Sequence, residues 1–459
     1  LVLTDAGKPV FFSSGTDEDA SRTSAVIQAV ASCFSTDEEL QSFRSDSTLF
    51  VLRHAHPLIL VCVDKNGRCP GQLQTNLALL QAQILSVLTQ KQLQKQLLAR
   101  PSLDLRPLLS GTDVFLNSLC EQFQTGNPWS WLNALESLPL GRQTRKQLND
   151  ALLNSRGDSS LLYGLIACDN RFCAVVRPRQ HSLHPPDLHL VFNMLFHTSV
   201  FKDGEHWVPI CLPKFNANGF LYAYVTDIRP VNSSLPLKIV LISPSRQAFY
   251  EMQKVGNALI DQVPMPLVEK VCSARRLSIL SIGVQPIEYF VYKSKQNVQF
   301  LKSERVEKTP TANQETEVHE SNESNEPSGE DDDPEESQEP QETQEAEETD
   351  VISEIQEIQE IQEIQETQDI QENESDVLST SDIEKRFCTI QAQMYINNQR
   401  IGLQTLSSGT FLGWHSPLFE VYVYTSSYDK QALGKAVRKL VAYIRRYEQR
   451  LFLVDGAVF

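Results

Sequence analysis

The hydrophobic and polar positions at the start of the chain predict a fixed order of strands and helices. Apolar runs at residues 1–4 and 9–13 flank a turn with Gly7, and an acidic segment then opens a helix that reaches about residue 34. Three short strand-like runs follow at 40–44, 48–53 and 58–63. A long helix comes next and stops at Arg100-Pro101. Its apolar residues recur every three or four positions: Leu73, Leu77, Leu80, Ile84 and Val87.

The same order returns twice. The second segment predicts strands at 161–168 and 172–177, a helix from Pro185 to about 197, strands at 207–212, 220–226 and 237–243, and a helix at 245–262. The third predicts a strand at 288–293, a helix at 383–395, strands at 401–406, 410–415 and 419–425, and a helix at 430–450. Each unit favours an antiparallel sheet with helices packed on it, so the fold class is α+β with three domains.

An acidic segment interrupts the third unit and sets the charge of the whole chain. The chain has 41 basic and 58 acidic residues, a net charge of −17. Residues 309–384 hold 28 of the acids and no Lys or Arg, so the remainder has 41 bases against 30 acids, or +11. A basic body favours acidic partners.

The acidic segment is also poor in apolar residues, so it cannot bury enough surface to offset its ordering entropy. Its Ile-Gln-Glu triplets at 355–372 repeat by three, and on a helix each Ile would slip by roughly 60° per triplet. We therefore predict a disordered insert at 303–384 inside the third domain. The predicted domains are 1–130, 155–278, and 286–302 plus 385–459.

The residues do not support disulfides, metal sites or common catalytic and nucleotide-binding motifs. The nine cysteines form no C-x-x-C pair, which favours reduced, buried thiols over disulfides or zinc. No phosphate-binding loop, dinucleotide fingerprint, nucleophile elbow or H-E-x-x-H motif is present. The candidate metal ligands His181, His184, His189 and His206 surround a Pro-rich loop, for which a surface loop is the better interpretation. We expect no catalytic residue, metal or cofactor.

The apolar runs and the start of the chain lead to expectations about membrane spans, a secretory signal and truncation. No run approaches the ~18 apolar residues of a membrane span, and no secretory signal opens the chain. Leu1 lies inside an apparent strand, so we expect the chain to be truncated at this end.

One block is specific enough to identify a family. Residues 207–225 read W-V-P-I-C-L-P-K-F-N-A-N-G-F-L-Y-A-Y-V, which resembles a signature of the vacuolar fusion protein Mon-one (monensin-sensitivity) family. Further blocks that resemble this family are D-A-G-K-P-V at 5–10, D-L-R-P-L-L-S-G at 104–111, S-R-Q-A-F at 245–249 and R-L-F at 450–452. The resemblance covers 1–302 and 386–459, and the chain departs from the family in its acidic insert.

The resemblance implies a fold and a function. It implies three longin domains, each a five-stranded antiparallel sheet flanked by helices, and a tri-longin partner of the Ccz-one type. The resulting heterodimer would be a guanine-nucleotide exchange factor for a late-endosomal Rab GTPase of the Rab-seven class. It would act in endosome maturation, vacuole fusion and autophagosome fusion, recruited by an early-endosomal Rab of the Rab-five class and by anionic phosphoinositide lipids.

By the same analogy the first domain would pair with the partner's first domain and dock the Rab, while the others form a scaffold. The protein would be cytoplasmic and peripheral on late-endosomal and vacuolar or lysosomal membranes. The alternative is a non-exchanging longin scaffold or tether subunit. A nucleic-acid binder could use the basic body, but no basic motif interleaved with aromatic residues supports it, so we expect no nucleic acid.

Three residues are candidates for partner contact. Ile27 and Gln28 lie on the first helix, near the exchange site that the resemblance implies; the alternative for Ile27 is packing on its own sheet. Trp207 opens a strand, and an exposed Trp at a sheet edge is a natural anchor. The alternative for Trp207 is a core position.

The last predicted helix separates apolar from basic residues. At about 100° per residue, one third of its circumference collects Leu433, Val437, Leu440, Val441, Ile444, Tyr447 and Leu451. The opposite side collects Lys435, Arg438, Lys439, Arg445, Arg446 and Arg450. Basic residues near an anionic membrane gain about 1 kcal/mol each, so we expect Lys435, Arg438, Lys439, Arg445 and Arg446 to contact lipid. The alternative is a solvated helix face.

Overall fold

The computed structural model describes residues 1–34, 39–65, 67–181, 183–197, 201, 204–230, 235–305, 378–454 and 456–459. The Ile-Gln-Glu repeat and most of the predicted insert lie outside these residues.

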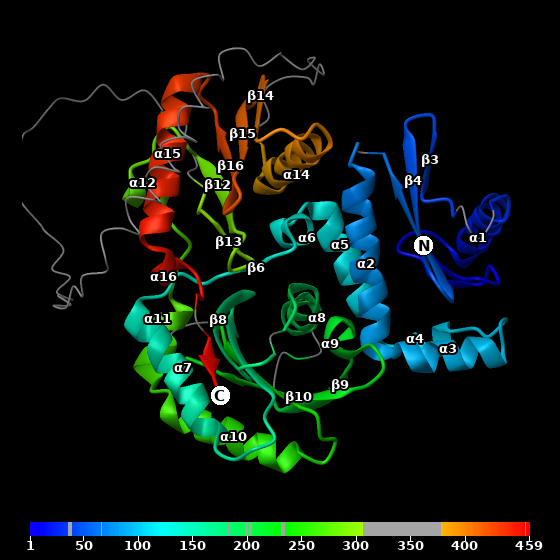
Figure 1. Ribbon diagram of the computed structural model, residues 1–459, viewed down its shortest axis with the longest axis horizontal. Coiled ribbons are helices and arrows are strands. Elements are labelled where there is room, and N and C mark those ends of the chain that lie inside the picture. The colour runs from blue at the N-terminus through cyan, green and yellow to red at the C-terminus, as the bar shows by residue number, and fades with distance from the viewer. Residues whose placement is uncertain are drawn as a thin grey trace, which may run out of the picture. The chain divides into compact units, whose positions relative to one another are not determined.

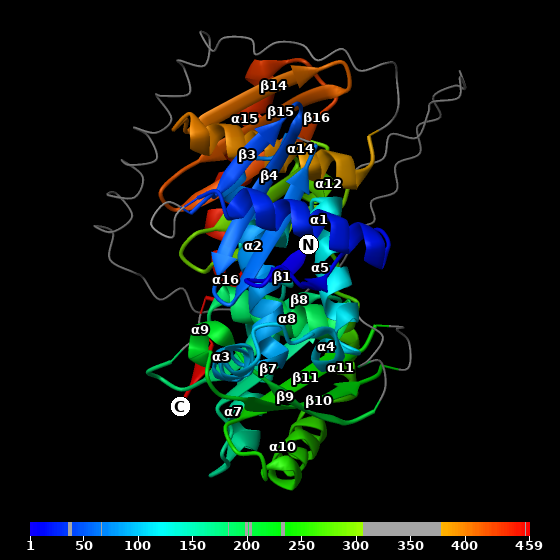
Figure 2. The ribbon, with the colours of Figure 1, turned by 90° about the vertical axis from the view of Figure 1, so that its right-hand side faces the viewer.

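The first domain is a five-stranded sheet with helices on both faces. Its strands are β1 (Val2–Thr4), β2 (Pro9–Phe11), β3 (Ser42–Ser45), β4 (Thr48–Ala55) and β5 (Leu58–Asp64). Helix α1 (Asp17–Ala31) lies across one face (Figure 2). The other face packs against α2 (Pro70–Val87), α3 (Gln90–Ala99), α4 (Arg106–Leu109) and α5 (Asp113–Thr125). Thr16 starts α1 through a capping box with Asp19.

A linker leads into the second domain and contributes α6 (Pro128–Leu132) and the two-residue strand β6 (Leu135–Glu136). The second sheet contains β7 (Tyr163–Cys168), β8 (Arg171–Arg177), β9 (His206–Ile210), β10 (Leu221–Ile228) and β11 (Leu237–Ser243). One face packs against α7 (Arg142–Arg156), α10 (Phe249–Gln262) and α11 (Met265–Cys272). The other packs against α8 (Pro185–Phe196), with the short α9 (Pro213–Asn216) beside it (Figure 1).

The third domain follows α12 (Ile279–Ile282). Its sheet contains β12 (Tyr289–Ser294), β13 (Gln299–Lys302), β14 (Ile401–Leu406), β15 (Gly409–His415) and β16 (Phe419–Thr425). Helices α14 (Thr380–Ile396) and α15 (Lys430–Arg446) lie on opposite faces (Figure 1). The chain then adds α16 (Glu448–Leu451) and β17 (Ala457–Val458).

All three sheets share one strand order. If the strands of each domain are numbered along the chain, the order is 2-1-5-4-3: β2-β1-β5-β4-β3, β8-β7-β11-β10-β9 and β13-β12-β16-β15-β14. In each domain a helix follows the second strand and another follows the fifth. This repetition confirms the predicted α+β class with three antiparallel five-stranded units.

The second and third sheets each gain a sixth strand from elsewhere in the chain. β17, at the end of the chain, pairs parallel with β8 of the second sheet. β6, from the linker, pairs parallel with β13 of the third. Because such pairing joins residues far apart in sequence, the sequence pattern did not reveal it. The two exchanged strands tie the second and third domains together.

The helices differ from prediction at several places. The long helix after the third strand-like run is two helices, because Thr89 breaks it and caps α3 through a bond to the Gln92 N–H at 3.3 Å. Helix α7 lies before the predicted start of the second domain at 155, yet its Leu148 and Leu152 belong to that domain's core. Helix α14 begins at Thr380, so residues 380–384 belong to a helix and not to the predicted insert.

Candidate functional site

Ile27 does not face solvent. Its side chain is 2% exposed and packs with Leu3, Leu52 and Ile59 between α1 and the first sheet. This is the alternative stated for Ile27 in the sequence analysis, and a side chain in this position cannot touch a partner directly. It holds α1 on its sheet.

Gln28 is half-buried and serves the neighbouring hairpin. Its Nε2 donates to the Asp5 carbonyl at 3.0 Å. Gly7, at φ +78° in that hairpin, approaches so closely that a Cβ there would lie 3.3 Å from the Gln28 Cγ. Gln28 therefore fixes the first hairpin on α1.

The same face of the first sheet carries a partly exposed apolar surface, on which Phe43 and Phe50 are half-buried. Phe43, Phe50 and Val63 are direct cross-strand neighbours on β3, β4 and β5, and we call them the β3–β5 patch. The Phe43 and Phe50 rings stack with centroids 4.6 Å apart, and Val63 is 46% exposed. On α1, Val26 is 58% exposed. Adjacent exposed apolar side chains of this kind mark interaction surfaces more often than isolated ones.

Trp207 lies on the edge strand β9 and is half-buried. Its indole stacks on Tyr222 with centroids 5.7 Å apart and meets Phe249 edge-on at 6.1 Å. Phe249 touches Tyr250, which is 79% exposed at the start of α10. Trp207 is thus part of an aromatic cluster at a sheet edge, partly packed on the core and partly open.

Helix α15 shows the separation of apolar and basic sides that the sequence predicts. Its buried residues are Leu433, Ala436, Val437, Leu440, Val441 and Ile444. Lys435, Lys439 and Arg446 are exposed, and Arg438 and Arg445 are half-buried. Lys439 donates to the Gly283 carbonyl at 2.9 Å, so one of the five bases also holds the segment after α12. The helix contains no Asp or Glu.

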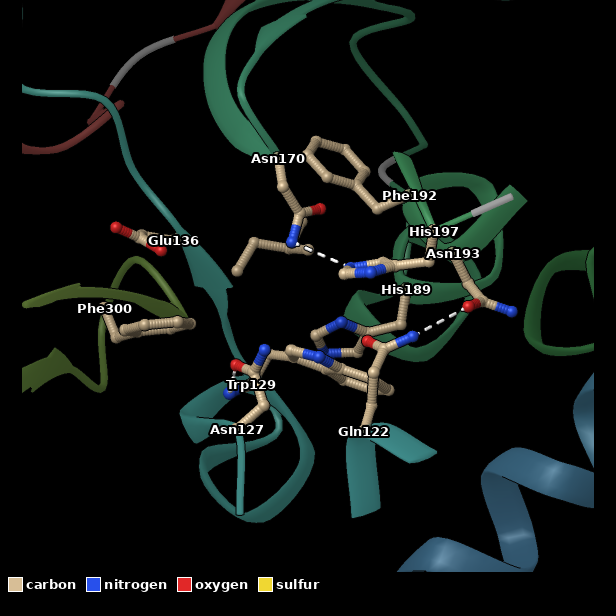
Figure 3. Close-up of a pocket in the computed structure, with 11 residues that line it drawn as sticks. Gln122, Asn127, Trp129, Glu136, Asn170, His189, Phe192, Asn193, His197 and Phe300 are labelled. Atoms are coloured by element: carbon tan, nitrogen blue, oxygen red, sulfur yellow. Dashed lines mark hydrogen bonds between the residues drawn. The ribbon is translucent and has the colours of Figure 1, made fainter. Parts of the chain in front are cut away.

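Buried polar side chains join the first domain to the second. The Asn193 Oδ1 on α8 accepts from Gln122 Nε2 on α5 at 2.9 Å (Figure 3). It also accepts from Ser118 Oγ of the same helix at 2.9 Å. Its Nδ2 donates to Gln83 Oε1 on α2 at 3.1 Å. All four side chains are buried, so these bonds form in a low-dielectric setting and fix the angle between the elements.

Beside this cluster lies a small polar cavity that contains a buried histidine. His189 packs against the Trp129 ring at 4.7 Å, and Asn170 and His197 share a 3.0 Å hydrogen bond across the cavity (Figure 3). The cavity volume is about 20 Å³, which suits one water molecule. Burial lowers the pKa of His189 from 6.5 to about 3, so it is neutral in the fold.

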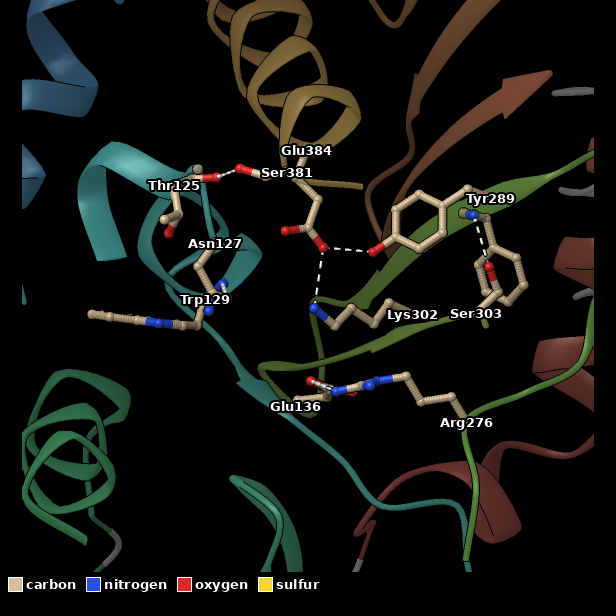
Figure 4. Close-up of polar contacts among 12 residues, drawn as sticks. Thr125, Asn127, Trp129, Glu136, Arg276, Tyr289, Lys302, Ser303, Ser381 and Glu384 are labelled. Atoms are coloured by element: carbon tan, nitrogen blue, oxygen red, sulfur yellow. Dashed lines mark hydrogen bonds and ion pairs between the residues drawn. The ribbon is translucent and has the colours of Figure 1, made fainter. Parts of the chain in front are cut away.

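A second set of polar contacts stabilises the third domain internally and joins it to the rest of the chain. Glu384 on α14 accepts from the Tyr289 hydroxyl at 2.5 Å and pairs with Lys302 at 3.1 Å (Figure 4). In the exchanged strand β6, Glu136 pairs with Arg276 at 2.6 Å. Ser381 Oγ donates to the Thr125 carbonyl of the first domain at 2.8 Å. The three domains therefore meet through side-chain hydrogen bonds and through apolar packing.

The candidate metal ligands do not form a site among the described residues. No group of three or more His, Cys, Asp or Glu there could hold a metal ion, and His181, His184, His189 and His206 do not converge. Five cysteines are buried: Cys168, Cys173, Cys211, Cys272 and Cys388. Within this part of the chain no helix has the length and apolarity of a membrane span.

Sequence reasoning missed the β3–β5 patch and the polar junction. The apolar run at 48–53 predicted a strand, but whether α1 covers Phe50 depends on where the helix crosses the sheet. Asn193 sits in an apolar helix, and a lone Asn there could have indicated a buried polar contact.

Two family models match the chain. One, described as the first longin domain of FUZ, MON1 and HPS1, matches residues 1–119, and one described as the second longin domain of these proteins matches 159–261. Both ranges coincide with domains of the structure and support the longin-like assignment.

Curated relatives carry one name. The chain is 40% identical over 308 residues to "Vacuolar fusion protein MON1" of Yarrowia lipolytica, which is 66% of this chain and 56% of the relative. It is 28% identical over 479 residues to the Saccharomyces cerevisiae protein of that name, covering 100% of this chain and 71% of the relative. It is 31% identical over 322 residues to "Vacuolar fusion protein MON1 homolog A" of Homo sapiens, covering 69% and 48%. The chain thus spans about half the length of the Yarrowia and human relatives.

Proposed function

Because the chain is a homologue of the vacuolar fusion protein MON1 family with longin domains, we propose that it is one subunit of a heterodimeric guanine-nucleotide exchange factor. The second subunit is a tri-longin protein of the Ccz-one type, and the substrate is a late-endosomal Rab GTPase of the Rab-seven class. The complex acts in endosome maturation and in vacuole and autophagosome fusion, on the cytoplasmic side of late-endosomal and vacuolar membranes.

The observation that carries the proposal is the partly exposed apolar surface of the first sheet. Phe43, Phe50 and Val63 form this surface within the segment that matches the first longin model, and Val26 of α1 is exposed in the same domain. A second longin domain seated on this face would bury these side chains. Burying apolar surface contributes roughly 25 cal/mol per Å², which favours a permanent heterodimer.

Exchange by this route requires no acid, base or metal from the factor. Nucleotide release follows when a partner binds the nucleotide-free GTPase more tightly than the loaded form. To invert a 99:1 equilibrium, the difference in affinity must be about 10⁴-fold. Such a difference needs a docking face of fixed shape. The hydrogen bonds of Asn193, between the first two domains, and of Ser381, between the third and the first, support a rigid arrangement of the domains.

The aromatic cluster around Trp207 is the proposed docking surface for a recruiting protein, the early-endosomal Rab of the Rab-five class. Trp207 and Tyr222 stack at a sheet edge, and Tyr250 extends the aromatic surface into solvent. Rigid aromatic side chains of this kind are frequent anchors in interfaces.

The basic side of α15 is the proposed contact with anionic phosphoinositide lipid. Lys435, Arg438, Lys439, Arg445 and Arg446 supply five positive charges on a helix without acids. Their apolar counterparts are buried in the third domain, so only the basic side remains for a membrane.

The experiment is a nucleotide-release assay with the copurified heterodimer and a late-endosomal Rab loaded with a fluorescent GDP analogue. We expect the heterodimer to accelerate release and the variant Phe43→Asp to fail to copurify with the second subunit. A heterodimer that forms but leaves the release rate unchanged would indicate the scaffold or tether alternative.

A further inference from the structure

Equivalent sheet edges are paired with an added strand in the second and third domains but not in the described part of the first. In the second domain the outer edge of its second strand, β8, is paired with β17, and in the third domain the outer edge of β13 is paired with β6. The equivalent strand of the first domain is β2, and its outer edge has no strand among the described residues. An unpaired edge presents backbone N–H and C=O groups that can pair with another chain.

The edge at β2 borders a cleft of the first domain. This cleft has a volume of about 400 Å³ and lies between β2, the start of α1, and α4–α5. Its floor is apolar and buried, with Val10, Ala20, Leu109 and Leu116. The blocks at 5–10 and 104–111, nearly a hundred residues apart, meet here.

The cleft is preformed. The turn before α1 contains Gly15 at φ +114°, where a Cβ would lie 2.6 Å from the Phe12 ring, so only glycine allows this approach. The opposite wall is fixed by Arg106, which binds Asp104 at 2.8 Å and approaches Asp17 at 3.6 Å. A wall held in this way lowers the ordering cost when a ligand binds.

The charge around the cleft selects the ligand. Asp17 and Asp113 are exposed on its rim, and Asp104 balances the single basic lining residue, Arg106. The lining itself carries two acids, Asp17 and Asp113, against one base, Arg106, which also approaches Asp17. This excess of one acid disfavours an anionic ligand, although the cleft includes the start of a helix. It favours a ligand with a Lys or Arg beside an apolar group.

We infer that the first domain binds an extended segment of another polypeptide, which adds to the β2 edge as a parallel strand. The segment takes the place that β17 and β6 occupy in the other two domains. It buries an apolar side chain on Leu109 and Leu116 and places a basic side chain at Asp17 or Asp113. The β3–β5 patch lies at the other edge of the same sheet, so the peptide and a partner on that patch can bind together.

The test uses the intact chain, alone and with its second subunit. A phage library of random 12-residue peptides is selected on the chain and, in parallel, on the variant Asn117→Trp, whose indole fills the cleft from an exposed lining position. Enriched peptides are then synthesised and measured by fluorescence anisotropy. We expect sequences with an aliphatic or aromatic residue next to Lys or Arg, and protection of the β2 amides from hydrogen exchange when the peptide binds.

Matched variants separate the cleft from the rest of the surface. We expect Asn117→Trp to weaken peptide binding by about tenfold or more, and Asp17→Lys with Asp113→Lys to weaken it by about fivefold. Asn257→Trp, exposed on α10, and Glu18→Lys, an acid of the same first turn outside the cleft, should bind as the wild type does. Acidic consensus sequences, no enrichment over Asn117→Trp, or equal affinity for that variant would each overturn the inference.

Discussion

The neutral, buried His189 makes the stability of the fold depend on pH in a way that can be measured. His189 is 3% exposed, and its Nε2 has no hydrogen-bond partner among the described residues. Burial lowers its pKa to about 3, whereas an unfolded histidine titrates near 6.5. Since the folded pKa lies below the unfolded one, the unfolded state binds the proton and the fold is destabilised as pH falls below 6.5.

The expected size follows from these two values. At pH 5.5 about ten elevenths of the unfolded His189 is protonated and almost none of the folded, which favours unfolding by about 1.4 kcal/mol. At pH 7.5 the same term is below about 0.1 kcal/mol. The variant His189→Phe retains an aromatic contact with Trp129 and cannot take up the proton, so it should lose this part of the pH dependence.

The assay is urea unfolding followed by tryptophan fluorescence, because the Trp129 ring packs against His189. The free-energy difference between His189→Phe and the wild type should shift by about 1.4 kcal/mol in favour of the variant from pH 7.5 to 5.5. His184→Gln, an exposed histidine at the cap of the same helix, is the control and should keep the wild-type profile. A constant difference between His189→Phe and the wild type would refute the reasoning.

Three further experiments test the proposed interface, a buried arginine and the basic side of α15. Phe43→Asp should abolish copurification with the tri-longin partner while the melting temperature of the chain stays close to wild type. Ser42→Asp, on the opposite face of β3, is the control. Retained copurification of Phe43→Asp would exclude the patch as the interface. Arg145 is buried and donates to the carbonyls of Cys173 at 2.8 Å and Leu138 at 2.9 Å, so Arg145→Ala should cost about 3 kcal/mol in urea unfolding, against less than about 0.5 for exposed Arg142→Ala. Charge reversal of Lys435, Arg438 and Lys439 on α15 should weaken cosedimentation of the folded protein with phosphoinositide liposomes. Unchanged binding would assign this helix face to solvent.

The sequence predicts best what local periodicity determines. The apolar side of α15 followed from the spacing of Leu433, Val437 and Leu440, and all three are buried. The final helix nevertheless ends at Arg446 and a short α16 follows, because Tyr447 leaves the helical conformation between them. The predicted alternation of strands and helices likewise reappears in each of the three units.

What the sequence could not show depends on contacts between distant residues. The strands β6 and β17 are two residues long, and their pairing is decided by sheets that lie more than a hundred residues away. The orientation of Ile27 toward Leu3 was one of two alternatives, because a residue on a predicted helix can face either way until the sheet beneath is known. The cleft beside β2 appears only when the two blocks at 5–10 and 104–111 are brought together.

Nucleotide release from a late-endosomal Rab of the Rab-seven class is the most direct test of the proposed function. The rate is compared with buffer, with the chain alone and with the copurified heterodimer, at one Rab concentration. The account predicts at least about tenfold faster release with the heterodimer and little effect of the chain alone. Equal rates in all three conditions would contradict it.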